Sequence, residues 1–339
     1  MRGTVLLTGV SGYIGLHCAA QLLKEGFAVR GSVRSTTKEK EVIDSLATAS
    51  VDVSRLSIVD LNLTSDLGWE TAVSGCDYVM HVASPYVVAN PKHESEMITP
   101  AVDGTLRVLR ASEKSGVKRV VLTSSALAMM ASLKTGTFGP KDWADTNAPH
   151  LSTYAKSKIL AEKAAWDFFA HLGKTKPMQM VSINPGIVFG PPLGRDISGQ
   201  SMSMLDKMLR GKMPLVPNTA FPAVDVRDVA LLHVKALTHP DVVGKRIIAS
   251  SSESHGFAEV AQILKNEGYK GPSTRVAPNL MLRIAAIFDR EARGMLGYLD
   301  INVIADNSAT RQLFDWRPIP FTKMVLDSAA AVKRIQDNS

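Results

Sequence analysis

The feature that most constrains this chain is a glycine-rich turn that follows its first apolar strand. Residues 5–8 read Val-Leu-Leu-Thr, and Gly9, Gly12 and Gly15 follow with the spacing G-x-x-G-x-x-G. The first glycine allows a tight turn, the second lets a pyrophosphate approach the backbone, and the third lets a helix pack closely on the strand. The helix that begins here would direct free N–H groups at the phosphates. We therefore expect a dinucleotide site, the alternative being a tight turn without a ligand.

Beyond this turn, short β-branched runs alternate with longer helical patterns. Strands are expected at 5–8, 28–33, 56–59, 78–82, 120–123, 178–183 and 246–249, and helices at 12–26, 38–49, 67–73, 96–115, 152–172 and 225–237. Nearly continuous apolar strands that alternate with helices indicate a parallel sheet covered on both faces, with right-handed connections. The expected fold class is therefore α/β, with a Rossmann-type doubly wound parallel sheet.

The pattern changes after Asn184, where prolines and glycines gather as far as Gly194. The length of 339 residues exceeds the usual size of one domain, and the strand expected at 246–249 suits a return to the sheet. We therefore expect residues 1–183 and 224–250 to form the nucleotide-binding domain. Residues 184–223 and 251–339 would form a smaller, interleaved and mostly helical substrate-binding lobe.

Composition excludes several classes of protein. Apolar residues make up 45% of the chain, which is enough to offset chain entropy and argues against disorder. The formal charge of +7 is dispersed along the chain, so we expect no nucleic acid partner. Neither a membrane span nor a signal peptide is expected from the apolar runs. With Cys18 and Cys76 as its two cysteines, the chain suits a reducing, cytoplasmic compartment. The protein is expected to be a monomer or a homodimer.

The end of the second expected strand carries basic rather than acidic residues. Sites for NAD usually place Asp or Glu here, on the ribose hydroxyls, but no acid lies between Glu25 and Glu39. Arg34 stands in this stretch, with Lys38 and Lys40 close behind. Because a guanidinium suits a 2′-phosphate, this favours NADPH over NADH, an ordinary surface arginine being the alternative.

Two further strand ends carry candidate residues. Asp60 follows the third strand and could accept from the adenine amino group, while Leu61 could pack on the ring. The alternative for Asp60 is an ordinary turn residue at the end of a strand. His81, at the end of the fourth strand, is expected to support the strand rather than do chemistry.

A tyrosine and a lysine stand four residues apart within the helix expected at 152–172. Tyr154 and Lys158 would share one face of that helix, about 6 Å apart along its axis. An ammonium near a phenol lowers the pKa of the phenol from its usual value of about 10, which makes Tyr154 a usable general acid. Ser124 and Ser125 end the fifth strand, where one hydroxyl could hold a substrate carbonyl and the other serve the structure.

Several motifs occur in the order of one known family. They are TGVSGYIG at 8–15, HVASP at 81–85, TSS at 123–125, YAKSK at 154–158 and NPGIVFGP at 184–191. Together they resemble the extended short-chain dehydrogenase/reductase family. The stretches VRGSVRS at 29–35 and VDVRDVA at 224–230 are similar to its dihydroflavonol reductase, cinnamoyl-CoA reductase and aldehyde/ketone reductase group.

The resemblance implies a role for each matching residue, with NADPH as the cofactor. The catalytic residues would be Ser125, Tyr154 and Lys158, of which Tyr154 and Lys158 would also bind the cofactor. The remaining implied cofactor contacts are Gly9, Gly12, Tyr13, Ile14 and Gly15 at the pyrophosphate; Arg34 and Lys38 at the 2′-phosphate; Asp60 and Leu61 at the adenine; Val82, Ala83 and Ser84 along the ribose path; and Pro185 and Val188 by the nicotinamide.

The substrate side is expected to be apolar and rich in methionine. The expected pocket residues are Met129, Met130, Phe189, Met202 and Phe221, with core filling as the alternative for each. Met130 stands where plant flavonoid reductases have a polar residue, and the stretch HLSTYAKSK replaces the NWYCYGK of cinnamoyl-CoA reductases, so neither plant activity is favoured. No two histidines have metal-ligand spacing, so no metal is expected.

These observations predict an NADPH-dependent carbonyl reductase that converts hydrophobic aldehydes or ketones, as small-molecule substrates, to alcohols. The enzymatic alternatives are an NAD-dependent nucleotide-sugar epimerase or dehydratase and a hydroxysteroid dehydrogenase. The non-enzymatic alternative is a dinucleotide-sensing regulator. Arg34 counts against the NAD-dependent enzymes, and the Tyr154 and Lys158 pair counts against the regulator.

Overall fold

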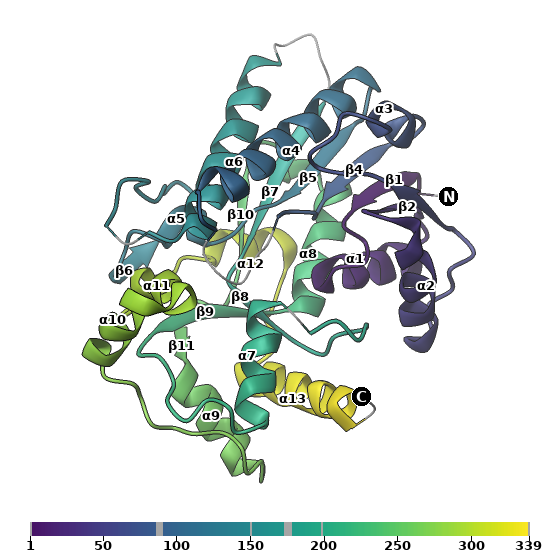
Figure 1. Ribbon diagram of the computed structural model, residues 1–339. Coiled ribbons are helices and arrows are strands. Elements are labelled where there is room, and N and C mark those ends of the chain that lie inside the picture. Colours follow the sequence, from purple (N-terminus) through teal and green to yellow (C-terminus); the bar gives the residue numbers. More distant parts are fainter. Residues whose placement is uncertain (1, 86–90, 150, 173–177, 198, 338–339) are drawn as a thin grey trace.

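The computed structural model describes residues 2–85, 91–149, 151–172, 178–197 and 199–337. The main strands are β1 (Thr4–Thr8), β2 (Ala28–Val33), β3 (Leu56–Asp60), β4 (Tyr78–His81), β5 (Arg119–Thr123), β7 (Gln179–Pro185) and β10 (Arg246–Ala249). Within the described ranges they form a seven-stranded parallel sheet in the order β10-β7-β5-β4-β1-β2-β3 (Figure 1). The expected fold class is thereby confirmed, and the expected strands differ from these only at their ends.

Successive side chains of each strand lie on opposite faces of the sheet and enter two hydrophobic clusters. On β1, Val5 and Leu7 belong to one cluster and Leu6 to the other. On β5, Val121 and Val120 are divided in the same way. Because both faces are covered, almost every position of these strands must be apolar, which explains the continuous apolar runs in the sequence.

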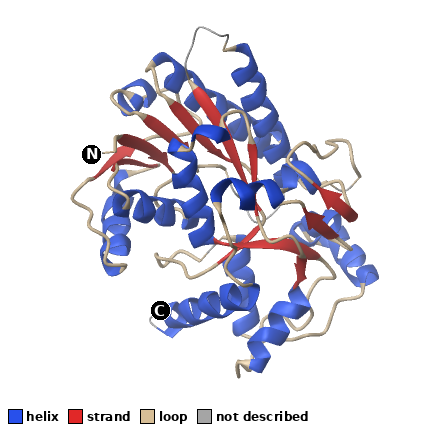
Figure 2. Ribbon diagram, turned by 180° about the vertical axis from the view of Figure 1, so that it is seen from behind, coloured by secondary structure: helices blue, strands red, loops and turns tan. Residues whose placement is uncertain are grey.

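Helices cover the two faces of the sheet (Figure 2). One cluster packs under α1 (Tyr13–Lys24), α2 (Glu39–Thr48) and α8 (Val226–Thr238), and the other under α3 (Trp69–Val73), α4 (Ser95–Lys114) and α6 (Thr153–His171). Side-chain caps fix two of the starts: Ser152 accepts from the N–H of Ala155 at α6, and Asp225 accepts from the N–H of Arg227 at α8. Among the described helices, none is long and apolar enough to cross a membrane.

Most of the other elements form a lobe beside the sheet (Figure 1). Its strands are β8 (Ile187–Phe189), β9 (Ala220–Asp225) and β11 (Ser254–Gly256), which make one small sheet, and β6 (Thr135–Phe138) and β12 (Asn302–Ala305), which make another. The remaining helices are α5 (Leu127–Met130), α7 (Gln200–Leu209), α9 (Phe257–Asn266), α10 (Asn279–Phe288), α11 (Arg290–Met295), α12 (Ser308–Phe314) and α13 (Phe321–Asp337). Of these, α12 packs on β10 of the main sheet. The 3-10 turns at Thr36–Lys38 and Pro240–Val242 connect elements of the main sheet, and a third 3-10 turn lies at Leu296–Tyr298.

The chain leaves the main sheet after β7 and returns to it at α8 and β10. β10 pairs with β7, and α8 packs against α1, so both belong to the main sheet although lobe segments lie on either side of them in sequence. The small lobe strands were not located from the sequence, since stretches such as TGTF in β6 and SHG in β11 contain no continuous apolar run. The domain limits 1–183, 224–250, 184–223 and 251–339 stay a prediction.

The glycine turn between β1 and α1 is closely packed. Gly9 has a φ of +71°, a conformation that favours glycine. A Cβ added to Gly15 would lie 2.1 Å from the carbonyl oxygen of Gly9, well inside contact distance. α1 can therefore pack on the end of β1 only with glycine at position 15.

We expect Gly15→Ala to lower the free energy of unfolding by about 1–3 kcal/mol, the usual cost of forcing an extra carbon into a packed site. The matched control is Gly199→Ala, because that glycine has a φ of −59° and no heavy atom within 4 Å of an added Cβ. Thermal and denaturant unfolding would measure both variants. Equal stability of the two would show that the turn does not need this glycine.

Candidate active site

The sheet places the carboxyl ends of β1, β4 and β5 side by side, since these strands are parallel neighbours. The glycine turn follows β1, residues 82–84 follow β4, and Ser124 and Ser125 follow β5. Lys158 from α6 lines a cavity together with Ser84 and Ser124. Ligands of open α/β sheets bind at this edge, so the structure brings the expected catalytic residues to a suitable place.

Tyr154 and Lys158 lie on one face of α6, as their spacing predicts. The Nζ atom of Lys158 is 5.8 Å from the centre of the Tyr154 ring. Lys158 is 7% exposed, and this burial lowers the pKa of its ammonium to about 8, while the negative charge of Glu162 opposes the change. Near pH 7 a protonated lysine therefore stands beside the half-buried phenol.

The two serines after β5 point to different partners. Ser124 is buried, and its hydroxyl donates to Oε2 of Glu162 at 2.6 Å. Ser125 is half-buried, and its Oγ accepts from the N–H of Leu127 at 3.2 Å. The Ser124 hydroxyl is thus committed to the interior, which leaves Ser125 as the candidate for substrate contact.

His81 is fixed by the end of β1. Thr8 Oγ1 accepts from the N–H groups of Val82 and Ala83, each at 3.1 Å, so the Thr8 hydroxyl donates its own hydrogen to Nδ1 of His81 at 2.8 Å. Burial, with Lys158 adding to it, lowers the pKa of the His81 imidazole to about 3, so the ring is neutral. The expected supporting role of His81 agrees with these contacts.

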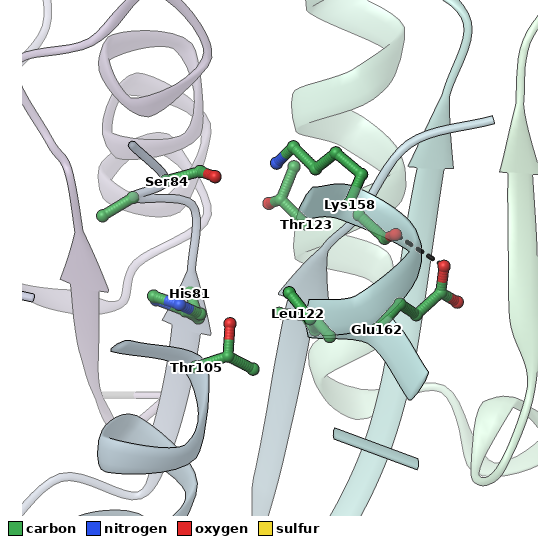
Figure 3. Close-up of a pocket in the computed structure, with 10 residues that line it drawn as sticks. His81, Ser84, Thr105, Leu122, Thr123, Lys158 and Glu162 are labelled. Atoms are coloured by element: carbon green, nitrogen blue, oxygen red, sulfur yellow. Dashed lines mark hydrogen bonds between the residues drawn. The ribbon is translucent and has the colours of Figure 1, made fainter. Parts of the chain in front are cut away.

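A small polar cavity lies between β4 and α6. Its volume is about 10 Å³, close to the space that one water needs. Figure 3 shows Lys158 and Glu162 on one side of it and His81, Ser84 and Thr105 on the other. In the described ranges, no three His, Cys, Asp or Glu side chains are grouped so that they could hold a metal.

The basic residues after β2 stand at the surface. Arg34 is exposed, and Lys38 pairs with Glu41 at 2.6 Å. Asp60 is also exposed and lies in register with Val33, directly before Arg34. Leu61 differs from its neighbour, because it is buried in the cluster under α3 and α4. Contact of these residues with a nucleotide stays a prediction.

The other expected cofactor residues come from α1, the ends of β4 and β7, and β8. Ile14, Val82, Ala83, Ser84 and Val188 are half-buried, and Pro185 is buried. A Cβ on Gly9 would lie 3.0 Å from the Cα of Ala83, so the turn and the end of β4 are in close contact. The hydroxyl of Tyr13 donates a hydrogen bond to the Gly190 carbonyl at 2.7 Å, which connects the start of α1 to the lobe.

Comparison with known proteins identifies the family of this chain. The family model "NAD dependent epimerase/dehydratase family" matches residues 5–249. The chain belongs to this family. It is 35% identical to cinnamoyl-CoA reductase CAD2 of Medicago truncatula, over 78% of this chain and 81% of that relative. It is 31% identical to ketoreductase azaE of Aspergillus niger, over 91% of this chain and 97% of that relative. The structure of Gre2 from Candida albicans in complex with NADPH is similar over 98% of this chain and 99% of that chain, with a TM-score of 0.79 and 26% identity. The resemblance to extended short-chain dehydrogenases/reductases is thereby confirmed.

The residues expected to line a substrate pocket are packed in the hydrophobic core of the lobe. Met129, Met130, Phe189 and Met202 are each 1% exposed and belong to two hydrophobic clusters of the lobe. Phe221 is half-buried and packs against both clusters. What the structure shows of these side chains is core packing, and their role as a substrate pocket stays a prediction.

Glu162 is the residue of the site that the sequence analysis missed. Its carboxylate is fully buried and accepts hydrogen bonds from Ser124, Trp166, Ser182, Asn184 and Arg246. The pair with Arg246 is 2.7 Å long, and the Arg246 side chain is 8% exposed. One signal was present in the sequence, since Glu162 stands four residues after Lys158 on the face that carries Tyr154.

We expect Arg246→Met to lower the free energy of unfolding by about 3–5 kcal/mol, because it leaves the buried Glu162 carboxylate without its counter-ion. Arg210→Met is the matched control, since Arg210 pairs with Asp206 at the surface, and such pairs contribute about 0.2–1 kcal/mol. Urea unfolding of both variants at neutral pH would measure the difference. A loss for Arg246→Met no larger than that for Arg210→Met would contradict the importance of the buried pair.

Proposed function

We propose that this protein is an NADPH-dependent reductase that converts aldehydes or ketones to alcohols. The observation that carries the proposal is the Tyr154 and Lys158 pair, with the ammonium 5.8 Å from the ring centre at the carboxyl edge of the sheet. Ser125 ends β5 at the same edge. The names of the ketoreductase and cinnamoyl-CoA reductase relatives point to the same class of carbonyl substrate.

The residues present fit NADPH. The turn after β1 approaches the end of β4 closely, and α1 begins there without an acidic residue in its first turn, which suits a pyrophosphate. Arg34 and Lys38 offer positive charge for a 2′-phosphate at the end of β2. The same cofactor accompanies the Gre2 structure from Candida albicans. When bound, NADPH supplies the hydride for the carbonyl carbon.

The chain's own residues would complete the reduction. Tyr154 donates its phenolic proton to the oxygen of the substrate as the carbon accepts hydride, so the carbonyl becomes an alcohol. Ser125 donates a hydrogen bond to the same oxygen and stabilises the charge that develops there. Lys158 binds the cofactor ribose, and its positive charge favours the ionised form of Tyr154, which makes proton donation easier.

The alternatives are less well supported. Enzymes of the family that epimerise or dehydrate nucleotide sugars use NAD, and an acidic residue after β2 would suit that cofactor. Arg34 occupies this stretch instead. A regulator that only senses dinucleotides has no need for a buried lysine beside a tyrosine.

We expect Tyr154→Phe to lower kcat by about 10²–10⁴-fold, because the general acid is removed while the ring is kept. NADPH affinity should stay within about twofold of wild type, since the phenol is not its main contact. Turnover would be followed as NADPH oxidation with a panel of aldehydes, diketones and β-ketoesters, and affinity by fluorescence titration. Wild-type turnover in this variant would overturn the mechanism.

We expect Arg34→Ala to weaken NADPH binding about tenfold to a hundredfold, as the loss of a charge-assisted hydrogen bond predicts, and to leave NADH binding nearly unchanged. Arg2→Ala is the control, because Arg2 is exposed and lies before β1, at the opposite edge of the sheet. Both cofactors would be titrated at one ionic strength. An equal loss for NADPH and NADH would overturn the cofactor assignment.

A further inference from the structure

The Glu162 carboxylate joins three strands to the helix that carries the candidate catalytic pair. Its Oε2 accepts from Ser124 after β5 at 2.6 Å and from Asn184 on β7 at 2.8 Å. Its Oε1 accepts from Ser182 on β7 at 3.0 Å and from Nε of Arg246 on β10 at 2.7 Å. A buried carboxylate is tolerated only with such partners, and together they fix α6 against the sheet.

The same contacts reach the backbone of Ser125. The Nδ2 group of Asn184 donates both to Glu162 and, at 3.2 Å, to the carbonyl oxygen of Ser125. Ser124, the preceding residue, is bonded to Glu162 directly. The segment that presents Ser125 is thus fastened to Glu162 on two sides.

Glu162 also acts on Lys158. Both line the cavity of Figure 3, one helical turn apart on α6, and Glu162 is the one carboxylate among the described residues that opposes the effect of burial on the Lys158 ammonium. The other cavity walls come from β4, α4 and β5 and contribute His81, Thr105 and Thr123, none of them charged near neutral pH.

From the far side, Arg246 is the cation that faces the Glu162 carboxylate. It stacks on the Trp143 ring, with its guanidinium carbon 3.8 Å from the ring centre, and donates to the carbonyl of Pro140. Arg246 therefore balances part of the negative charge that Lys158 experiences.

We propose that Glu162 is a positioning residue of the reductase site, which keeps Lys158 in its charged form and holds the segment that carries Ser125. The inference deepens the proposed function and rests on it for its catalytic meaning. The electrostatic part concerns the protein alone. It can be tested without substrate or cofactor.

The test follows the titration of Lys158 by NMR in full-length protein labelled with ¹³C-lysine. The Lys158 signal is assigned by its loss in Lys158→Met, and the wild-type midpoint is expected near pH 8. In Glu162→Gln the midpoint should fall by about one pH unit, because removal of a nearby negative charge disfavours the ammonium. A residue that only stabilises the fold would lower the unfolding temperature and leave this midpoint in place.

A double variant, Glu162→Gln with Arg246→Gln, keeps the test decisive if the single variant does not fold. It removes both buried charges, so its midpoint should lie between those of Glu162→Gln and wild type. An unchanged Lys158 midpoint in every folded variant would overturn the inference.

Kinetics separate this inference from the proposed function. If the wild-type protein reduces carbonyls, the pH dependence of kcat/KM should change in Glu162→Gln, because Lys158 loses its charge at lower pH and no longer favours the ionised form of Tyr154 there. Failure of the wild type to reduce any carbonyl would reject the proposed function, while a shifted Lys158 midpoint would still support the electrostatic role of Glu162. Carbonyl reduction with an unmoved midpoint and an unmoved pH profile would reject the role of Glu162 alone.

Discussion

The geometry of the site depends on one buried ion pair, between Glu162 and Arg246. Removing two charges from water costs several kcal/mol per ion, so such a pair persists only where further hydrogen bonds surround it. Here serine and asparagine side chains from β5 and β7 supply them. Because the donors come from different strands, α6 has little freedom to slide or rotate on the sheet, and Tyr154 is held in the same way as Lys158.

Local signals in the sequence predicted the main sheet and the glycine turn. Each main strand is a short apolar run, and each crossover helix has a matching pattern, so both can be read from neighbouring residues. Tyr154 and Lys158 could be found for the same reason, since four residues on a helix define one face. The role of Glu162 could not, because its partner Arg246 is 84 positions away. The pairing of β6 with β12 could not be predicted for the same reason, because it joins residues such as Thr135 and Asn302 that are far apart in the sequence. The methionines were ambiguous in the sequence, because a protein core and an apolar pocket are both lined by such side chains, and only their burial in the structure shows core packing.

The glycine turn and the lobe are joined by side chains of α1. Tyr13 donates to the Gly190 carbonyl, and His17 donates through Nε2 to the Pro191 carbonyl at 2.9 Å. Burial lowers the pKa of His17 to about 4, so the ring stays neutral and can donate from one nitrogen only. Gly190 in turn donates its N–H to Ser328 on α13. The helix that begins at the expected pyrophosphate site is thus bonded to the first lobe segment and, through it, to the last helix described.

The charge of the site is local, although the chain as a whole carries +7. At the cavity His81 is neutral, Lys158 is positive near pH 7, and Glu162 is negative but partly balanced by Arg246. Burial lowers the pKa of the Lys158 ammonium, and the negative charge of Glu162 raises it, so the pKa of about 8 reflects both effects. A general acid works best when its own pKa is near the working pH, so a positive charge beside the Tyr154 phenol would favour its proposed role. The position of Arg246 on the edge strand β10 would therefore bear on the proposed chemistry at Tyr154 through two intervening side chains, Glu162 and Lys158.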